Sequence, residues 1–327
     1  MSDAESDLDG GAAAFEAARP KLMAIAYRML GSVAEAEDVV GDVAVRWAGA
    51  DREAVEVPEA WLVAVTSRRA LDVLRSARLR REEYPGVWLP EPVATGDGPA
   101  ELAERNESLT MGFLLLLERL TPIERAVLVL HDALGYGYGA VADALDRSEA
   151  ACRQALHRAR AHVTVPARRR AGNLTRAAAV TGRFLAAGAG GDVTELLATL
   201  SPEVVALADG GGIVHASMRP VRGPAAVGRF VSNLVARLGE VRTFPIELNG
   251  RPGVVVHGGG RWAATTVDVD AAGLVTAVYI VASPAKLERL VAAIPGAADL
   301  PGPWEGAGRF RHRRGRPVAP TDRVRPR

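Results

Sequence analysis

Hydrophobic positions in the first part of the chain recur with a helical period. Apolar residues from Phe15 to Leu30 repeat every three or four positions, which predicts a helix that ends at Gly31-Ser32. A second helix follows, with valines on one face and acidic residues on the others. Pro58 then precedes a long third helix, Glu59–Arg81, whose C-terminal half is rich in arginine. The three helices are expected to close one small all-helical domain over residues 15–83.

The pattern breaks in the middle of the chain and then returns to helix. Prolines and glycines are dense between Tyr84 and Pro99, which favours an extended linker over residues 84–105. Helical periodicity resumes near Glu101 and predicts a second all-helical domain over residues 106–167. Its helices are short because turn signals interrupt them repeatedly.

Beyond Gly172 the pattern changes to a mixture of helices and alternating strands. The expected helices are Leu174–Ala187, Asp192–Leu200, Pro224–Leu238 and Pro284–Ile294. The expected strands are Val204–Leu207, Ile213–Ser217, Arg242–Leu248, Val254–His257, Trp262–Val269 and Leu274–Val281, with a hairpin turn at Asn249-Gly250. This arrangement predicts an α+β domain over residues 171–294, so the fold class is multidomain, two all-α domains followed by one α+β domain.

The two ends of the chain carry few apolar anchors. Residues 1–14 are acidic, and residues 295–327 are rich in proline, glycine and arginine, so we expect both segments to be disordered. The arginines of the tail either add non-specific attraction to DNA or are simply solvated charge.

Composition and charge narrow the class of protein. The net charge of +1 over 327 residues hides arginine-dense segments that offset acidic ones. The single cysteine, Cys152, lies in a helical pattern and is expected in the core, so no disulfide framework is available. We find no secretory signal and no apolar run near the roughly 20 residues of a membrane span. A cytoplasmic protein with no membrane partner is therefore expected.

The segment Leu120–Val163 carries the strongest local signal. It predicts a helix at Thr121, a turn at Gly135–Tyr138, a short helix, and a last arginine-bearing helix capped by Ser148. Such an order is typical of a helix-turn-helix, whose last helix enters the major groove of DNA. Arg153 and Gln154 would then read base edges, and Arg158 would hold a phosphate. The alternative is an ordinary helical bundle with a solvated basic face.

Two further segments, Ala34–Val43 and Thr66–Arg75, resemble region two of sigma factors, and Leu120–Val163 resembles region four. In order and spacing they resemble the extracytoplasmic-function group of the sigma-70 family. The linker motif at Tyr84–Pro92 and the glycine-rich motif Asp209–Gly212 resemble those of a subgroup with a fused SnoaL-like domain. The resemblance implies that residues 171–294 form a cone-shaped α+β domain.

The resemblance implies partners and residue roles. The partners are the RNA polymerase core enzyme, through the clamp helices of its largest subunit, and promoter DNA. A small ligand of the α+β domain is left open, and no cofactor is implied. The residues implied to dock on the polymerase are Asp38, Val39, Asp42 and Val43, for which a solvated acidic face is the alternative. Those implied to bind the minus-ten element are Arg68, Asp72, Arg75 and Arg78, and those for the minus-thirty-five element are Arg153, Gln154 and Arg158.

Regulatory positions follow from the linker and the glycine-rich motif. They are Trp88, Leu89, Pro90, Glu91 and Pro92 in the linker, and Asp209, Gly210, Gly211 and Gly212 in the α+β domain. We expect the two motifs to touch in the free protein, because regulation in cis needs a contact that differs between two states.

This sequence departs from the subgroup at three places. Arg68 stands where many relatives have asparagine, Ile213 follows the glycines where relatives have lysine, and Ser283–Leu287 lacks the Asn and Asp of the related motif. These differences leave the base preference and the role of the missing lysine open.

Three interpretations of the whole chain remain. The first is a sigma factor that directs promoter recognition, DNA melting and initiation, with its activity modulated in cis by the α+β domain. The second is a helix-turn-helix regulator with a ligand-sensing cone, which leaves the first domain unexplained. The third is a small-molecule isomerase or cyclase, for which the acid-base candidates are Asp209, His215, His257 and Asp268. They lack diagnostic spacing, and the sequence has neither a catalytic constellation nor a metal-ligand cluster, so no enzyme and no metal site are expected.

Overall fold

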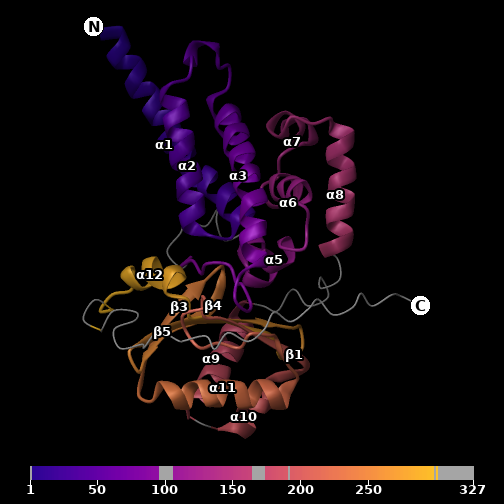
Figure 1. Cartoon of the computed structure of the whole chain (residues 1–327), viewed down its shortest axis with the longest axis vertical. Coiled ribbons are helices and arrows are strands. Elements are labelled where there is room, and N and C mark those ends of the chain that lie inside the picture. Colours follow the sequence, from indigo (N-terminus) through magenta and orange to yellow (C-terminus); the bar gives the residue numbers. More distant parts are fainter. Residues whose placement is uncertain (1, 96–105, 164–173, 191, 298–299, 301–327) are drawn as a thin grey trace.

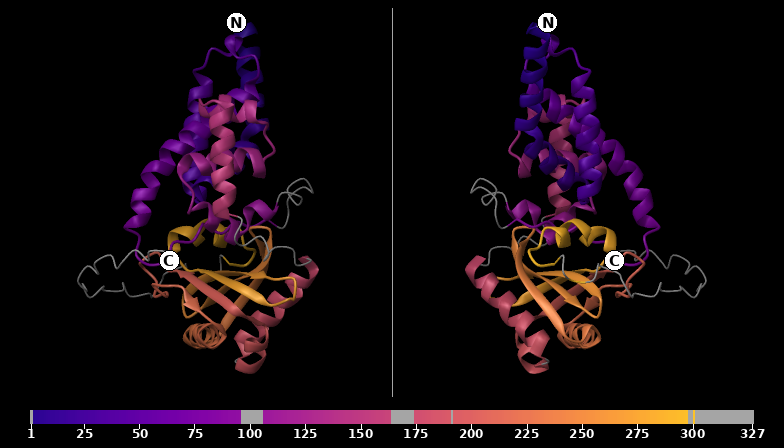
Figure 2. Two further views of the ribbon diagram at one scale, coloured as in Figure 1. Left: turned by 90° about the vertical axis from the view of Figure 1, so that its right-hand side faces the viewer. Right: turned by 90° about the vertical axis from the view of Figure 1, so that its left-hand side faces the viewer.

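The structure, a computed structural model, describes residues 2–95, 106–163, 174–190, 192–297 and 300. The first two ranges form a helical part, and the later ones form a curved sheet with helices on both faces (Figures 1 and 2). The helical part and α12 (Pro284–Ala292) lie on one face of the sheet. The other three helices of the later ranges cover the opposite face.

The helical part contains most of the elements that the hydrophobic periodicity predicts. Its helices are α1 (Ser2–Leu30), α2 (Val33–Ala48), α3 (Pro58–Glu82), α5 (Met111–Leu117), α6 (Pro122–Leu128), α7 (Tyr138–Leu145) and α8 (Glu149–Val163). Single turns of other helix types are η1 (Arg52–Ala54), η2 (Asn106–Leu109) and the π-type η3 (Val129–Ala133). Among the described residues, no helix is both long enough and apolar enough to cross a bilayer.

The prediction of disorder for residues 1–14 is wrong from Ser2 onward, because α1 begins there. The composition suggested disorder since it is acidic and glycine-containing. However, the indole N–H of Trp47 donates a hydrogen bond to the carbonyl of Gly11 at 2.7 Å, and Phe15 is buried in the core. A contact from α2 thus anchors the early turns of α1, and acidic residues near a helix N-terminus complement its dipole.

The α+β part has a six-stranded mixed sheet in the order β2-β1-β6-β5-β4-β3. Its strands are β1 (Leu200–Asp209), β2 (Val221–Arg222), β3 (Val241–Leu248), β4 (Arg251–Gly258), β5 (Arg261–Val269) and β6 (Val275–Val281). Among the described strands, only β1 and β6 pair in parallel. The helices on the far face are α9 (Leu174–Gly190), α10 (Val193–Ala198) and α11 (Pro224–Leu238) (Figure 1).

Most predicted elements of this part are confirmed, but one strand is not. α11 has the predicted bounds, and the hairpin turn is present with Asn249 at φ 52° and Gly250 at φ 70°. The strand predicted at Ile213–Ser217 does not form: a turn follows β1, and the short β2 pairs with β1 instead. Left-handed Gly211 and Gly212 redirect the chain before any ladder can form.

Other predictions fall only partly on described residues. The linker from Glu83 to Thr95 contains no helix and touches the sheet through a bridge between Ala94 and Leu248. Residues 96–105, 164–173 and 301–327 lie outside the described residues, and with them most of the expected disordered tail. The start of that tail is part of the fold, because Ala297 is buried.

The two helical regions share one hydrophobic core, although the sequence predicts them as separate domains. Buried side chains from α1–α3 and from α5–α8 belong to one cluster, and α3 packs on both α6 and α7. At the centre lies Arg125 of α6, which is only 2% exposed. Its guanidinium donates to the carbonyls of Met29 in α1 at 2.7 Å and Leu117 in α5 at 2.9 Å, and pairs with Glu118 at 2.6 Å.

Replacing Arg125 with methionine should destabilise the chain by about 3 kcal/mol, because it removes two buried hydrogen bonds to the carbonyls of Met29 and Leu117 and breaks the ion pair with Glu118. Methionine keeps an apolar chain of similar length, so cavity formation contributes little. Urea unfolding of the full chain measures the change. The matched control is Arg119→Met in the turn between α5 and α6, where the side chain is exposed and the change should cost less than about 0.5 kcal/mol. Equal losses in both variants would contradict a structural role for Arg125.

Candidate functional site

The helix-turn-helix is built by α7, a three-residue turn and α8. Asp146 adopts the left-handed conformation at φ 53° that ends α7, and the Ser148 hydroxyl caps α8 by accepting from the Ala151 amide. Cys152 is 1% exposed and lies in the core, as predicted. The next two residues, Arg153 and Gln154, are exposed in the second turn of α8, the part of a recognition helix that enters the groove.

The arginines of α8 already have acidic partners in the free chain. Arg153 pairs with Glu149 at 2.7 Å, and its guanidinium lies 5.4 Å from the ring of Tyr138. Arg158 pairs with Glu124 of α6 at 2.8 Å, which the sequence did not indicate. Both side chains remain more than half exposed, so a phosphate or base edge can compete with the carboxylates.

A second polar surface follows α3. Arg68 is exposed, and Asp72 pairs with Arg75 one turn later at 3.2 Å. Arg78 lies in the same helix, but its side chain is outside the described residues.

A hollow that sequence reasoning missed lies beside the loop from α2 to α3, lined by residues between 50 and 61. Its rim includes Val57, whose side chain is 57% exposed.

The predicted polymerase-docking residues divide into two sets on α2. Val39 and Val43 are buried in the core of the helical part, so they fix the position of α2 and present no surface in this conformation. Asp38 is exposed, and Asp42 is partly exposed and pairs with Arg69 at 2.7 Å. An acidic outer face and an apolar inner face are what the helical period of this segment requires.

Asp209, at the end of β1, binds the linker. Its carboxylate is 1% exposed and accepts hydrogen bonds from the Tyr84 hydroxyl at 2.6 Å and from the amides of Leu89 and Gly211, both at 2.9 Å. Lys286 of α12 completes the set at 2.7 Å. The predicted contact between the linker and the glycine-rich turn is therefore present in the structure.

Lys286 ties three elements together, and sequence reasoning noted its motif without assigning it a role. Besides Asp209, it donates to the Leu89 carbonyl at 2.5 Å. Its ammonium lies 4.4 Å from the centre of the Trp88 ring. The guanidinium of Arg81 lies 3.8 Å from the centre of the same ring. Burial lowers the pKa of Lys286, while the carboxylate of Asp209 opposes that shift. Burial raises the pKa of Tyr84, and the same carboxylate raises it further.

Glycine is required at positions 211 and 212 because other segments of the chain approach the backbone closely there. Gly211 has φ 66°, and a Cβ there would lie 2.5 Å from the hydroxyl of Ser283. Gly212 has φ 70°, and a Cβ there would lie 2.5 Å from the ring of Pro85 in the linker. The turn can therefore press against both the linker and the start of α12 only because side chains are missing. Ile213, where the subgroup has lysine, is exposed.

Glu91 joins the linker to region two. It is 3% exposed and accepts from the Val33 amide at 2.8 Å and the Ser32 hydroxyl at 3.2 Å, at the N-terminus of α2. Arg289 of α12 approaches Glu91 at 3.8 Å and pairs with Glu37 of α2 at 2.5 Å. The α+β domain thus contacts the helix that carries the predicted polymerase-docking residues.

Asn249, in the β3–β4 turn, is a contact that sequence reasoning missed. Its amide group donates to the Tyr27 hydroxyl at 2.7 Å and to the Leu109 carbonyl at 3.1 Å, and its carbonyl accepts from Val93 at 3.1 Å. One side chain thereby joins α1, the linker and the start of the second helical region. The Asn-Gly pair predicts the turn but gives no sign of these contacts.

The acid-base candidates of the enzyme interpretation do not form a site. Asp209 is bound to the linker, and Asp268 accepts from the Tyr279 hydroxyl at 2.7 Å. None of Asp209, His215, His257 and Asp268 lines the cavity between the sheet and helices α9 and α11, and no group of three potential metal ligands occurs among the described residues.

The architecture defines the class of protein: two helical units, one with a helix-turn-helix, whose connecting linker is bound to an α+β domain. Residues 14–80 match the family model of sigma-70 region 2, and residues 111–163 match that of sigma-70 region 4. The RNA polymerase sigma factor SigJ of Mycobacterium tuberculosis is 42% identical over 229 residues, which are 69% of this chain and 73% of SigJ. The chain belongs to the extracytoplasmic-function sigma factors of the sigma-70 family.

Further similarity extends through the α+β domain. The crystal structure of the M. tuberculosis sigma factor SigJ superposes with a TM-score of 0.67 at 35% identity, covering 84% of this chain and 97% of that one. The probable sigma factor SigI of the same organism is 29% identical over 295 residues, 89% of this chain and 99% of SigI. The fold is two helical sigma domains followed by an α+β domain, and the protein is a transcription initiation factor, not an enzyme.

Replacing Glu91 with glutamine should change stability in a pH-dependent way. Burial raises the pKa of Glu91 above its ordinary 4.5, even though Val33, Ser32 and Arg289 oppose the shift. The folded state therefore binds more protons, and the stability this group contributes is complete below 4.5 and is lost as pH rises through the folded pKa. Urea unfolding between pH 4 and pH 7, a range set by that shift, should show the wild type losing stability relative to Glu91→Gln as pH rises.

The matched control is Glu37→Gln, since Glu37 is a partly exposed acid that also contacts Arg289. That variant measures how much of any change comes from losing a contact with Arg289 and not from the burial of Glu91. A constant difference between wild type and Glu91→Gln over the whole range would refute the effect of burial.

Proposed function

We propose that this sigma factor is held closed by its own C-terminal domain and opens when it engages RNA polymerase and a promoter in the cytoplasm. The single observation that carries the proposal is the burial of the Asp209 carboxylate against the linker. In this proposal α3 binds the minus-ten element through Arg68, Asp72, Arg75 and Arg78, and α8 reads the minus-thirty-five element. The acidic face of α2 at Asp38 and Asp42 docks on the clamp helices of the polymerase.

The spacing of promoter elements supports an opening step. The two elements are about 25 base pairs apart, which is roughly 85 Å of duplex at 3.4 Å per base pair. In the free chain, α3 packs directly on α6 and α7, and such packed helices lie about 10 Å apart. One chain in this packing cannot span both elements, so the shared core must separate before both are bound.

The linker is the segment that such a separation must move. Leu89 is fully buried in a cluster with α12 and the sheet, and Met111 from the second helical region lies in the same cluster. Contacts with the C-terminal domain therefore stabilise the closed state over the open one, which is the differential contact that regulation in cis needs.

The hollow beside the α2–α3 loop suits the melting step. An unstacked base needs a pocket with apolar surface, and stacking contributes about 1–3 kcal/mol per base. The hollow offers Trp61, which is half-buried against Trp47 with ring centroids 5.3 Å apart. We assign the capture of a flipped promoter base to this hollow.

Replacing Trp88 with alanine, or Gly211 with alanine, should raise promoter-dependent transcription by purified holoenzyme about fivefold or more, the range of ordinary allosteric coupling. The first change removes the ring between Arg81 and Lys286, and the second forces the turn away from Ser283. The measurement is transcript yield in vitro, on a promoter that the holoenzyme selects from randomised DNA, with saturating amounts of each variant.

Ile213→Ala is the matched control, since Ile213 follows the same turn but is 51% exposed, and its transcript yield should equal that of the wild type. Unchanged or lower yield from both Trp88→Ala and Gly211→Ala would contradict regulation by this contact. Point variants test the idea more cleanly than truncation after residue 167, because truncation also exposes the apolar side chains of Leu89 and Met111.

Replacing Arg153 with alanine should weaken holoenzyme binding to its selected promoter by about 1–3 kcal/mol and relax preference at one base pair of the minus-thirty-five element. Arg158→Ala should instead weaken binding to all sequences and lower the salt dependence by about one counterion. Competition binding at several salt concentrations distinguishes these effects. Arg183→Ala, an exposed arginine on α9, is the control. Equal preference in wild type and Arg153→Ala at every base pair would exclude direct readout by Arg153.

A further inference from the structure

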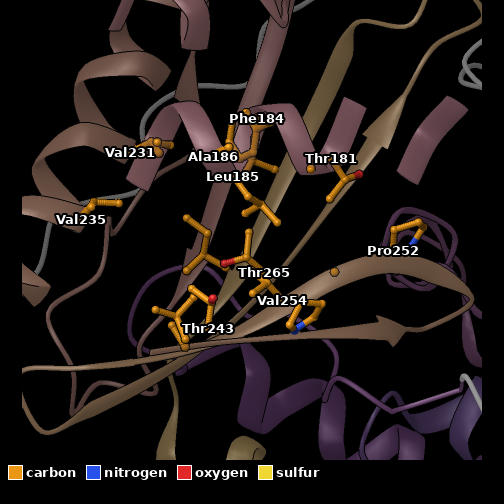
Figure 3. A pocket seen from close by; sticks show the side chains of 18 of the residues that line it. Thr181, Phe184, Leu185, Ala186, Val231, Val235, Thr243, Pro252, Val254 and Thr265 are labelled. Carbon is orange, nitrogen blue, oxygen red and sulfur yellow. The ribbon is translucent and has the colours of Figure 1, made fainter. Parts of the chain in front are cut away.

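The α+β domain encloses a large cavity between the sheet and its covering helices. Its volume is about 700 Å³, within the usual 300–1,000 Å³ range of small-molecule sites. The side chains that line it come from α9, α11 and strands β3–β6, and Figure 3 shows them pointing into a common space. The Asp209 cluster is elsewhere, since none of its members lines this cavity.

Strand register explains why this space is lined by one face of the sheet. Pro245, Val254, Thr265 and Ile280 are paired in register across β3, β4, β5 and β6, so their side chains project to the same side. Phe184 of α9 and Val231 of α11 lie opposite this row (Figure 3). The facing layers do not meet along the whole row, and the gap is the cavity.

The lining selects a ligand by polarity and charge. Most of the surface is aliphatic, and the hydroxyls of Thr181, Thr243 and Thr265 are neutral groups that can exchange hydrogen bonds with a ligand. No basic residue is among the described residues of the lining, and the single charged one is Glu247. The Glu247 carboxylate accepts from the Thr95 hydroxyl at 2.7 Å. An anionic ligand would therefore meet a like charge and no cation.

We propose that this cavity binds a neutral, mostly apolar small molecule about the size of two or three fused rings, carrying at most a few hydroxyl or carbonyl groups. The ligand enters beside the edge strand β3 and α9, where the lining residues Thr243 and Ala186 are exposed. The site stands whether or not the domain regulates transcription, so a failure of one idea leaves the other intact.

The test uses two dyes with the same aromatic skeleton and the full chain. N-phenyl-1-naphthylamine is neutral, and 8-anilino-1-naphthalenesulfonate adds one negative charge. Fluorescence titration should show saturable binding of the neutral dye at one site per chain, and binding of the sulfonate should be about tenfold weaker or more. Absence of saturable binding of the neutral dye, or equal affinity for the sulfonate, would overturn the proposal.

Variants locate the binding site. Thr265→Phe fills the centre of the cavity, and Thr243→Trp fills its mouth from an edge strand that tolerates aromatic residues. Each substitution should lower the affinity for the neutral dye by about tenfold. Circular dichroism and thermal melts verify that each variant is folded. Val193→Trp adds an equal aromatic surface on exposed α10, outside the lining, and should leave the affinity unchanged. Unchanged affinity in a folded Thr243→Trp protein would count against this cavity.

The alternative to a small molecule is that the chain's own residues 301–327 fill the cavity. Truncation after Leu300 should leave the affinity for the neutral dye unchanged. A rise of about tenfold on truncation would mean that residues 301–327 occupy the cavity, and it would overturn a small-molecule site.

Discussion

A fully buried carboxylate must have its partners, and this constraint on Asp209 organises the chain. The side chain sits at the end of β1, where water cannot reach it, so the cost of burying its charge must be offset by donors from the protein. Those donors come from the linker at Tyr84 and Leu89, from its own turn at Gly211, and from Lys286 in α12. Moving the linker away removes the two donors at Tyr84 and Leu89 at once and leaves the carboxylate with Gly211, Lys286 and water.

The same constraint extends to region two through a chain of buried polar groups. Glu91, two residues after Leu89 in the linker, accepts a hydrogen bond from the N-terminus of α2. Arg81, at the end of α3, lies over the ring of Trp88 and pairs with Glu118 of the second helical region at 2.5 Å. Each partner is a charged or hydrogen-bonding group whose loss would leave another unsatisfied. The two helical regions, which part in the opening proposed above, are thus joined by polar contacts as well as by the apolar core that contains Arg125. A purely apolar junction would resist opening far more strongly.

Local patterns predicted nearly all of the elements, and contacts between distant residues account for what they missed. Helix α11 and the Asn249-Gly250 turn follow from periodicity and turn chemistry, which are local properties. The strand expected at Ile213–Ser217 has the right alternation, but two left-handed glycines before it point the chain elsewhere. The resemblance implies that Val39 and Val43 dock on the polymerase, but the helical period places them on the apolar face, and the structure buries them in the core. The Tyr84–Asp209 contact spans 125 positions, so no local pattern could indicate it. Asp209 itself was found because a glycine-rich motif marks its turn.

The two faces of the sheet have separate tasks, and the β3–β4 hairpin lies between them. On one face, Pro245 and Val254 line the cavity; on the other, Val255 and Leu248 belong to the apolar cluster that buries Leu89 of the linker. Neighbouring residues of a strand point to opposite faces, so a shift of the hairpin backbone moves both sets together. The tip of the hairpin carries Asn249, which holds the linker and both helical regions. Thr95 of the linker donates a hydrogen bond to Glu247, a residue of β3 that also lines the cavity. The strand β3 therefore contacts both the linker and the cavity. The β3–β4 hairpin as a whole thus both lines the cavity and forms hydrogen bonds with the linker.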